Sequence, residues 1–279
     1  MSPAFTPTVA VLLVLLGVAV GAFGTLVGVG GGFLLAPVLL ILYPHESPQT
    51  ITAISLAVVF VNSVSGALAY GYQRRIDYRS GLVFGLAGVP GAIVGVLLVG
   101  AIPRKPFDAI FALVLFAVAA WLLLRTGRGV VSPHPHGAGA PRELVDSRGR
   151  RYAYRVRLGE GAVFGALIGI LSSLLGVGGG IFQVPLMIGA LGFPAAIATA
   201  TSQFVLVIVS FVGTATHVLN GSFAHGHGLR RTLCLSVGVI VGAQIGARVS
   251  LSLSAQTIQR LLAIAILVVA LRLGWAAAA

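Results

Sequence analysis

Gly28-Val-Gly-Gly-Gly32 returns in the second half of the chain as Gly176-Val-Gly-Gly-Gly180, an offset of 148 residues. Each copy is followed by a proline, Pro37 in the first and Pro185 in the second. Flanking residues repeat in the same order: Gly17 and Gly21 at Gly165 and Gly169, Thr52-Ala-Ile-Ser55 at Thr199-Ala-Thr-Ser202, and Gly91 and Gly95 at Gly242 and Gly246. This self-similarity indicates an internal duplication, which is a common organisation of secondary transporters.

Composition places most of the chain in lipid. The 279 residues include 18 Lys and Arg against 6 Asp and Glu, a formal net charge of +12. Only 9% of the residues are charged, whereas soluble domains carry about 25%. Hydrophobic residues make up 57%, and the mean hydropathy is +1.03. Too few polar residues remain to cover such an apolar core in water. Composition therefore excludes a soluble enzyme, a disordered chain and a nucleic-acid binder with one basic face.

Helices that cross a membrane need about 20 apolar residues each. Eight windows of this kind occur: Val9–Leu42, Ile51–Tyr70, Gly81–Ala101, Phe107–Leu124, Leu158–Leu191, Ala195–Leu219, Thr232–Leu253 and Ile258–Leu273. We therefore predict an all-α, multi-pass cell-membrane protein with about eight spans in two homologous four-helix repeats. Residues 1–124 form the first repeat, residues 125–157 a linker and residues 158–279 the second repeat.

The linker between the repeats is basic. It holds eight of the 18 basic residues and two acids, and its Ser132–Pro141 stretch has the Pro and Gly content of a segment with little to bury. Cytoplasmic loops carry the excess of Lys and Arg, so we expect the linker in the cytoplasm. Eight crossings would add further basic residues to that side, namely Arg74, Arg75, Arg79, Arg230, Arg231 and Arg272. They would leave three outside, namely Arg104, Lys105 and Arg260.

The first window of each repeat is oversized. Val9–Leu42 has 34 residues, or roughly 51 Å as one helix, which is too long for a single crossing. Consecutive glycines form helix poorly, so we expect this helix to break at GVGGG and to continue as a short second piece. The N-terminus of that piece would offer free N–H groups and a positive dipole end to an anion. The expected anion-binding glycines are Gly28, Gly30, Gly31, Gly32, Gly176, Gly178, Gly179 and Gly180.

Close helix packing is the alternative role for glycine in a membrane. We assign it to the three spaced pairs, Gly17 with Gly21, Gly91 with Gly95 and Gly242 with Gly246. The relation of the repeats stays open at this point. Four crossings per half make the repeats parallel, whereas short pieces that re-enter the membrane make them inverted and move the N-terminus to the other side.

Polar residues recur on one face of the second window in each half. Ser55 and Asn62 share such a face, and Ser202 and Gln203 lie at or near the matching place. Polar groups on a lipid-embedded helix must face protein or water, so we expect them to line a cavity and to bind an oxyanion. Ordinary hydrogen bonds between helices are the alternative. His217 lies on the face of Gln203 and is a candidate proton relay, with a neutral structural histidine as the alternative.

At the two GVGGG motifs, each with its downstream proline and a Ser-bearing next span, the chain resembles the sulfite-exporter (TauE/SafE) permease family. The resemblance covers both halves and is weakest in the linker. It implies an eight-span permease associated with sulfite, sulfonates and related sulfur-containing anions and usually with their export. We expect no cofactor. The partners implied are a small anionic substrate and the lipid bilayer.

Other functions lack the residues that they need. None of the six acids lies deep in a window, which disfavours cation transport and carboxylate-based hydrolysis. GVGGG is not followed by Lys-Ser/Thr, so ATP hydrolysis is unsupported, and we expect no metal site. A passive anion channel remains an alternative to the permease. So does a membrane-embedded sulfur-relay protein, for which Cys234 is the one thiol of the sequence.

Overall fold

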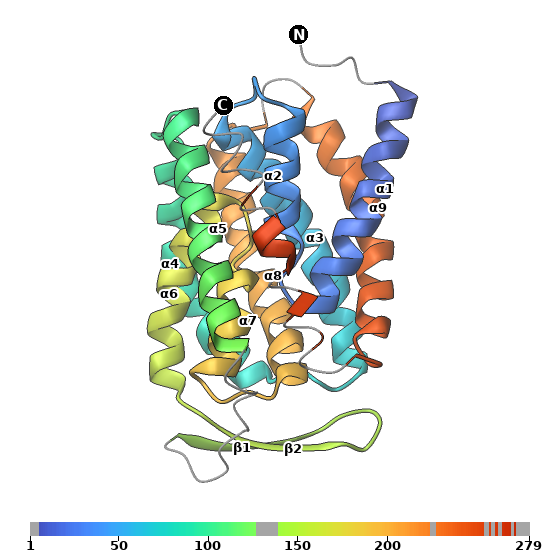
Figure 1. Cartoon of the computed structure of the whole chain (residues 1–279), viewed down its shortest axis with the longest axis vertical. Coiled ribbons are helices and arrows are strands. Elements are labelled where there is room, and N and C mark those ends of the chain that lie inside the picture. The colour runs from blue at the N-terminus through green and yellow to red at the C-terminus, as the bar shows by residue number, and fades with distance from the viewer. Residues whose placement is uncertain are drawn as a thin grey trace.

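A computed structural model describes residues 6–126, 139–223 and 227–253, together with residues 257, 260–261, 264–268 and 271. Nine helices and one two-stranded sheet are described (Figure 1). The helices are α1 (Pro7–Val27), α2 (Gly32–Leu42), α3 (Pro48–Tyr72), α4 (Tyr78–Val99), α5 (Arg104–Thr126), α6 (Leu158–Leu175), α7 (Gly180–Gly189), α8 (Ala195–Leu219) and α9 (Gly228–Val249). The strands are β1 (Ala140–Val145) and β2 (Arg151–Val156).

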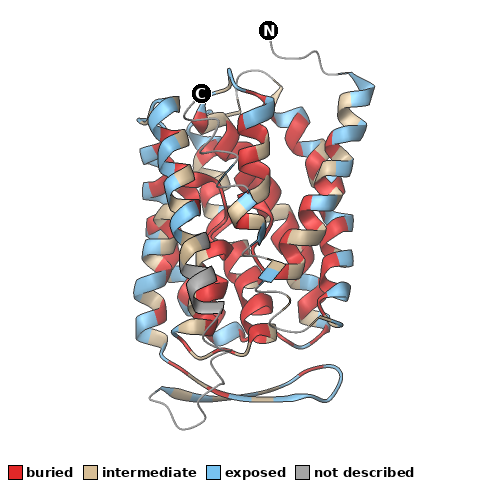
Figure 2. Cartoon of the chain, in the orientation of Figure 1, coloured by how far each residue is buried: buried red, intermediate tan, exposed pale blue. Residues whose placement is uncertain are grey.

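Two helices, α3 and α8, form the centre of the bundle. In the most apolar window of α3, 72% of the residues are buried, and in α8 67%, against 33–44% in α1, α4, α6 and α9. Buried residues accordingly gather along the middle of the bundle, and exposed residues lie on its outer helices (Figure 2). Polar side chains on α3 and α8 therefore face protein rather than lipid.

Glycines hold the outer helices in two close pairs, α1 with α9 and α4 with α6. A Cβ atom on Gly17 would lie 2.4 Å from the carbonyl oxygen of Leu235, and one on Gly242 would lie 2.3 Å from that of Val18. In the other pair, a Cβ atom on Gly91 would lie 2.2 Å from the carbonyl oxygen of Ala166. Only glycine permits these backbone approaches. The packing role predicted for the spaced glycines is confirmed.

Each GVGGG stretch turns the chain back on itself. The helices of each close pair run parallel, because Val14 and Ala22 of α1 face Gly238 and Gly246 of α9. Helix α1 starts, and α2 ends, at the same end of the bundle, the end opposite to the strands (Figure 1). Arg104 at the start of α5 lies at this end too, where it donates to the carbonyl oxygen of Leu40 in α2. The α6–α7 unit begins and ends at the other end, beside the strands. The α1–α2 and α6–α7 units, each of which reverses direction at its glycine loop, thus enter the bundle from opposite ends.

We call the end that carries β1 and β2 the hairpin end. The strands pair antiparallel, from Ala140 with Val156 to Val145 with Arg151. The amide of Ser147 in their turn donates to the carbonyl of Gln73, which follows α3. The chain is mostly helical, as predicted, but this folded β-hairpin occupies part of the segment that the sequence analysis interpreted as a linker.

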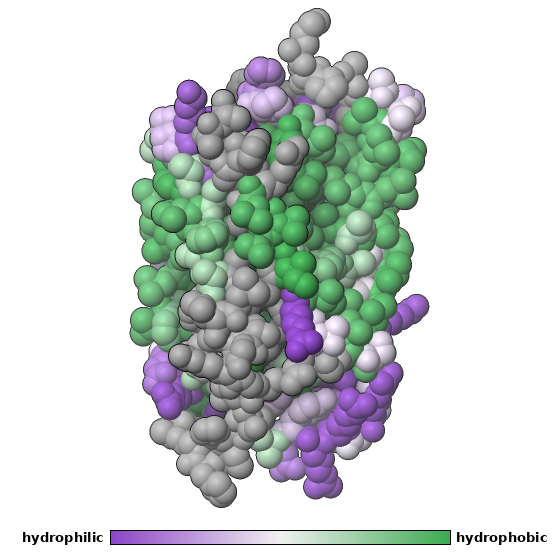
Figure 3. Space-filling model, in the orientation of Figure 1, coloured by the Kyte–Doolittle hydropathy of each residue, from purple (hydrophilic) through white to green (hydrophobic). Residues whose placement is uncertain are grey.

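The surface agrees with a membrane environment. On the face that Figure 3 shows, hydrophobic side chains cover much of the middle of the bundle, and hydrophilic side chains gather towards both ends. Among the described residues, six helices are long and apolar enough to cross a membrane: α1, α3, α4, α6, α8 and α9. The chain is therefore a multi-pass membrane protein.

One part of the charge assignment is wrong. Arg230 and Arg231 were expected on the same side as the linker, but they begin α9 at the end opposite to the hairpin end. There Arg231 pairs with Glu46 of the α2–α3 loop. The physical reason is that α6 and α7 together make a hairpin and not a crossing, so every later loop changes side.

Candidate functional site

The two glycine loops meet between α3 and α8. A Cβ atom on Gly32 would lie 2.9 Å from the carbonyl oxygen of Gly176, and one on Gly180 would lie 2.9 Å from that of Gly28. The side chains of Val59 and Leu206 lie against both loops, at Gly30 and at Gly178. All eight glycines that the sequence analysis named are buried. The structure therefore brings the two motifs together at the centre of the protein.

Positive φ angles make the loops specific to glycine. Gly28, Gly30 and Gly31 have φ of 79° to 81°, and Gly176, Gly178 and Gly179 have φ of 69° to 85°. Side chains other than glycine rarely adopt this conformation. Gly31 accepts the amide hydrogens of Leu34 and Leu35, and α2 then begins without a side-chain cap. First-turn amides of a helix have no partner within that helix, so each loop presents N–H groups inside the bundle.

A group of polar side chains surrounds the end of α1. We define the first-loop cluster as Thr25, Asn62, Ser63, Ser202 and Gln203, and all five are buried. The Thr25 hydroxyl donates to Asn62 Oδ1 at 3.2 Å, and Gln203 Nε2 donates to the carbonyl of Gly24 at 3.3 Å. The cluster thus joins α1 to both central helices.

Much of the hydrogen-bonding capacity of this cluster is unused. Within the described structure, Asn62 Nδ2, Gln203 Oε1 and the hydroxyls of Ser63 and Ser202 have no partner although they are buried. Unpaired buried polar groups are costly and are normally satisfied by protein, water or a ligand. A Cβ atom on Gly66 would lie 3.2 Å from both Gln203 Oε1 and Thr25 Oγ1, so glycine also keeps space beside these groups. This is the feature most suggestive of a binding site.

The corresponding group at the end of α6 is different. We define the second-loop cluster as Thr52, Ser55, Ser172, Ser173 and His217, all buried. The Ser55 hydroxyl donates to the carbonyl of Gly176, so this predicted ligand-binding serine serves the loop itself. The hydroxyls of Ser172 and Ser173 have no partner in the described part of the chain. The cluster contains no amide side chain.

His217 is held between two hydroxyls near the end of α8. Its Nδ1 lies 3.0 Å from Ser222 Oγ, and its Nε2 lies 3.5 Å from Thr52 Oγ1. This places the histidine beside the second loop and away from Asn62 and Gln203, which lie towards the hairpin end. His217 is fully buried, so a proton would reach it only through its hydroxyl neighbours.

Ion pairs that the sequence analysis did not predict cover both ends of the site. At the hairpin end, Arg75 pairs with Asp146 at 3.3 Å, and both side chains are buried. At the opposite end, Arg231 pairs with Glu46 at 2.8 Å, and its guanidinium lies 3.7 Å from the centre of the Tyr43 ring. No local sequence signal joins these partners, because each pair is far apart in the chain.

Asp146 is held in its ionised form. Burial opposes ionisation, but the amides of Arg150 and Arg148 and the guanidinium of Arg75 outweigh it and lower the pKa of the carboxyl. Asp77 makes a second contact to the β-hairpin, since the Tyr154 hydroxyl donates to it at 3.0 Å. Burial and the Asp77 charge raise the pKa of Tyr154, so the phenol stays protonated as a donor.

The family comparison agrees with this architecture. The model of the family described as sulfite exporter TauE/SafE matches residues 13–273. The chain belongs to the TauE/SafE family. The resemblance stated from the two GVGGG motifs is confirmed, and the chain is a membrane transporter.

Relatives of this TauE/SafE chain are named in the same way. It is 29% identical to the probable membrane transporter protein YunE of Bacillus subtilis, over 94% of the chain and 96% of that protein. It is 24% identical to a probable membrane transporter protein of Methanocaldococcus jannaschii, over 87% of each. It is 26% identical to the probable membrane transporter protein MamO of Paramagnetospirillum magneticum, over 94% of the chain and 44% of that protein. No solved structure matches the chain.

Proposed function

We propose that this membrane transporter is a secondary permease that exports small sulfur-containing oxyanions, such as sulfite or sulfonates, along the contact between its two halves. The family's description supports the substrate class. The observation that carries the proposal is the first-loop cluster, where Asn62 Nδ2 and the hydroxyls of Ser63 and Ser202 are donors without partners near a bare glycine backbone. Such groups can bind an oxyanion without a fixed cation at the site.

The anion is proposed to bind between the first loop and the central helices. Asn62 Nδ2 and the hydroxyls of Ser63 and Ser202 would donate to its oxygens, and the Gln203 side chain would orient them. The loop amides around Gly31 would add backbone donors and the positive end of the α2 dipole. Because these donors are all neutral, release of the anion on the far side would not require an ion pair to break.

The same proposal includes a topology. The two halves are homologous repeats with about eight membrane helices, counted from the six candidates, α5 and the helical segments between residues 257 and 271. The repeats are inverted, since the α1–α2 unit and the α6–α7 unit enter the bundle from opposite ends. The hairpin end is cytoplasmic, as the basic residues of the linker indicate.

Purified protein in liposomes tests the substrate class. Uptake of sulfite, thiosulfate, sulfoacetate and taurine would be measured with protein-free liposomes as the control. We expect at least one sulfur oxyanion to be taken up at ten or more times the control rate, and chloride not to be. Equal uptake of every anion, or uptake of none, would remove the proposal.

Two measurements separate the alternatives. A carrier accelerates uptake when unlabelled substrate is present on the opposite side, whereas a passive channel does not. A sulfur-relay protein would lose its activity when its thiol is removed, whereas the Cys234→Ala permease should keep its flux. Cys234 lies half-buried on α9, and the described residues contain no group of three His, Cys, Asp or Glu that could hold a metal.

A further inference from the structure

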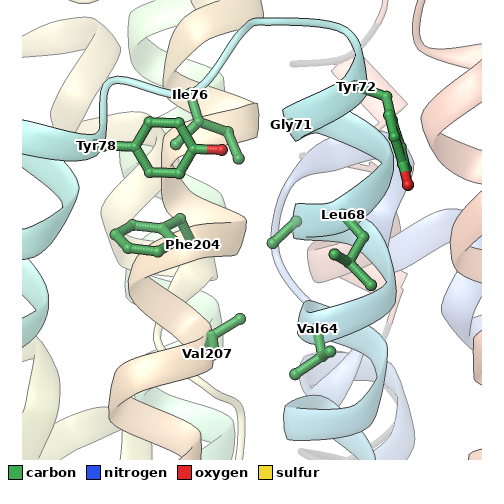
Figure 4. Close-up of a pocket in the computed structure, with 9 residues that line it drawn as sticks. Val64, Leu68, Gly71, Tyr72, Ile76, Tyr78, Phe204 and Val207 are labelled. Atoms are coloured by element: carbon green, nitrogen blue, oxygen red, sulfur yellow. The ribbon is translucent and has the colours of Figure 1, made fainter.

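A surface groove opens between α3 and α8 at the hairpin end, away from both glycine loops. Its volume is about 480 Å³. Its lining is almost wholly apolar, and Figure 4 shows that the side chains come from both central helices, from the loop between α3 and α4 and from the start of α4. The lining residues are Val64, Ala67, Leu68, Gly71, Tyr72, Ile76, Tyr78, Phe204 and Val207.

Aromatic side chains shape one end of the groove. The Tyr78 ring meets the Phe204 ring edge-on, with their centres 5.2 Å apart, and so bridges from α4 to α8. Tyr72 is 85% exposed at the end of α3. Tyrosines at this position are typical of the boundary between hydrocarbon and headgroups, where the ring lies in lipid and the hydroxyl in water. The groove therefore lies within the leaflet on the hairpin side.

Unpaired cations lie beside this aromatic end. Arg74 and Arg79 are exposed and flank the lining residues Tyr72, Ile76 and Tyr78 in the chain. Every described carboxylate at the hairpin end is engaged by another arginine: Asp77 by Arg142, Asp146 by Arg75, Glu143 by Arg151 and Glu160 by Arg157. Among the described residues, Arg74 and Arg79 have no carboxylate partner. The end of an apolar groove thus carries uncompensated positive charge.

We propose that this groove binds an anionic phospholipid, with one acyl chain between α3 and α8 and the headgroup phosphate on Arg74 and Arg79. The shape of the groove favours an acyl chain. The groove lies between two neighbouring helices, and a further helix, about 10–12 Å wide, is too wide to enter between them. The charge favours an anionic headgroup over a zwitterionic one. A second copy of the chain fits poorly, since a two-fold contact would place each arginine pair against its equivalent.

The full-length protein in detergent tests the proposal by native mass spectrometry. Phosphatidylglycerol and phosphatidylethanolamine with identical acyl chains would compete for binding. We expect phosphatidylglycerol to be retained preferentially, and the Arg74→Gln/Arg79→Gln variant to lose about tenfold or more of that preference. The matched control removes two exposed charges from the opposite end, Lys105→Gln/Arg230→Gln, and should keep the preference.

A second variant tests the apolar half of the site. Ala67→Phe fills the groove from α3 and should weaken retention of both lipids, and size-exclusion chromatography shows whether the variant is folded. Equal retention of the two lipids by the unmodified protein would overturn the proposal. So would equal loss in the Lys105→Gln/Arg230→Gln control. A dimer that strengthens when the arginines are removed would assign the groove to a second copy instead.

Discussion

The two glycine loops have the same backbone and different surroundings. Both turn at positive φ, and each lies against the early part of a central helix from the other half: Gly28 against Thr199, and Gly176 against Thr52. These contacts repeat at offsets of 147 and 148 residues. The two loops therefore share their backbone conformation and their contact with a central helix. These shared features do not by themselves explain where a ligand binds.

The difference lies in a few side chains. Asn62 and Gln203 beside the first loop correspond, at an offset of 147 residues, to Val209 and Leu56. Tyr70, whose hydroxyl donates to the carbonyl of Thr25, corresponds to His217. The first loop therefore has two amide side chains where the equivalent positions of the other half hold apolar residues. Of two loops with the same backbone, one can thus carry the polar side chains that bind a ligand, while the other contributes to packing.

The strongest way to break this contrast is to remove the amides. Asn62→Val/Gln203→Leu gives the first loop the surroundings of the second. We expect substrate flux in liposomes to fall at least tenfold, because Asn62 Nδ2 no longer donates a hydrogen bond to the charged ligand, a bond of about 1.5–3 kcal/mol, and Gln203 no longer orients the donors. The control is Ser172→Ala/Ser173→Ala beside the second loop, for which flux should stay within about threefold. Similar losses in the two variants would contradict a one-sided site.

The second prediction concerns the space available for a side chain on the helix that precedes each glycine loop. A Cβ atom on Gly24 would lie 2.2 Å from the amide nitrogen of Gly31, whereas the equivalent position in the second half is already Ser172. Gly24→Ser should therefore lower the free energy of unfolding by about 3 kcal/mol. The exchange Ser172→Gly should cost less than about 1 kcal/mol. Thermal unfolding in detergent measures both, and equal destabilisation would show that the two turns are packed alike.

The hairpin end of the site should respond to acid. A carboxyl with a lowered pKa stabilises the fold above its unfolded pKa of about 3.9 and loses this contribution as the pH falls through the folded value. The ion pair between Asp146, in the turn of the β-hairpin, and Arg75 should thus weaken below about pH 4. Asp146→Asn should cost about 3 kcal/mol at neutral pH, because it leaves Arg75 buried without a counter-ion.

Hydrogen exchange of the β1 and β2 amides measures this effect. Glu143→Gln is the matched control, since Glu143 pairs with Arg151 on an exposed surface and should contribute little. Amides that stay protected in Asp146→Asn would contradict the role of the buried ion pair.

The smallest expected effect concerns His217. In His217→Gln the amide keeps a donor and an acceptor near Ser222 and Thr52, so flux at neutral pH should stay within about threefold. If His217 relays a proton, as proposed from its place on α8, the dependence of flux on pH should flatten. A pH profile identical to that of the unmodified protein would leave the residue with a structural role only.

The general arrangement could be predicted from the sequence because glycine has few roles in a membrane helix. The spaced pairs Gly17 with Gly21 and Gly91 with Gly95 predicted close packing, and their neighbours are backbone atoms of other helices. The burial of Asn62 and Gln203 followed from polar residues on apolar helices. That Asn62 Nδ2 and Gln203 Oε1 lack partners could not be predicted, because it depends on the relative depth of three helices.

Two features escaped sequence analysis for physical reasons. Whether a short helix crosses or returns changes the side of every later loop, and hydropathy does not distinguish the two, so Arg230 and Arg231 were misplaced. The β-hairpin had a weak signal, an alternating Arg151–Val156 segment after the turn residues Asp146–Gly149. The basic residues and glycines of the same segment favoured the interpretation as a linker over that as a β-hairpin.

The pairing of α1 with α9 also constrains how the protein is made. Val18 of the first helix leaves the ribosome more than two hundred residues before its partner Gly242 is synthesised. The glycine face of the first helix therefore stays uncovered in the bilayer until α9 has been synthesised. Early termination before α9 would leave that face open, so truncated chains should be recognised by membrane proteases and cleared.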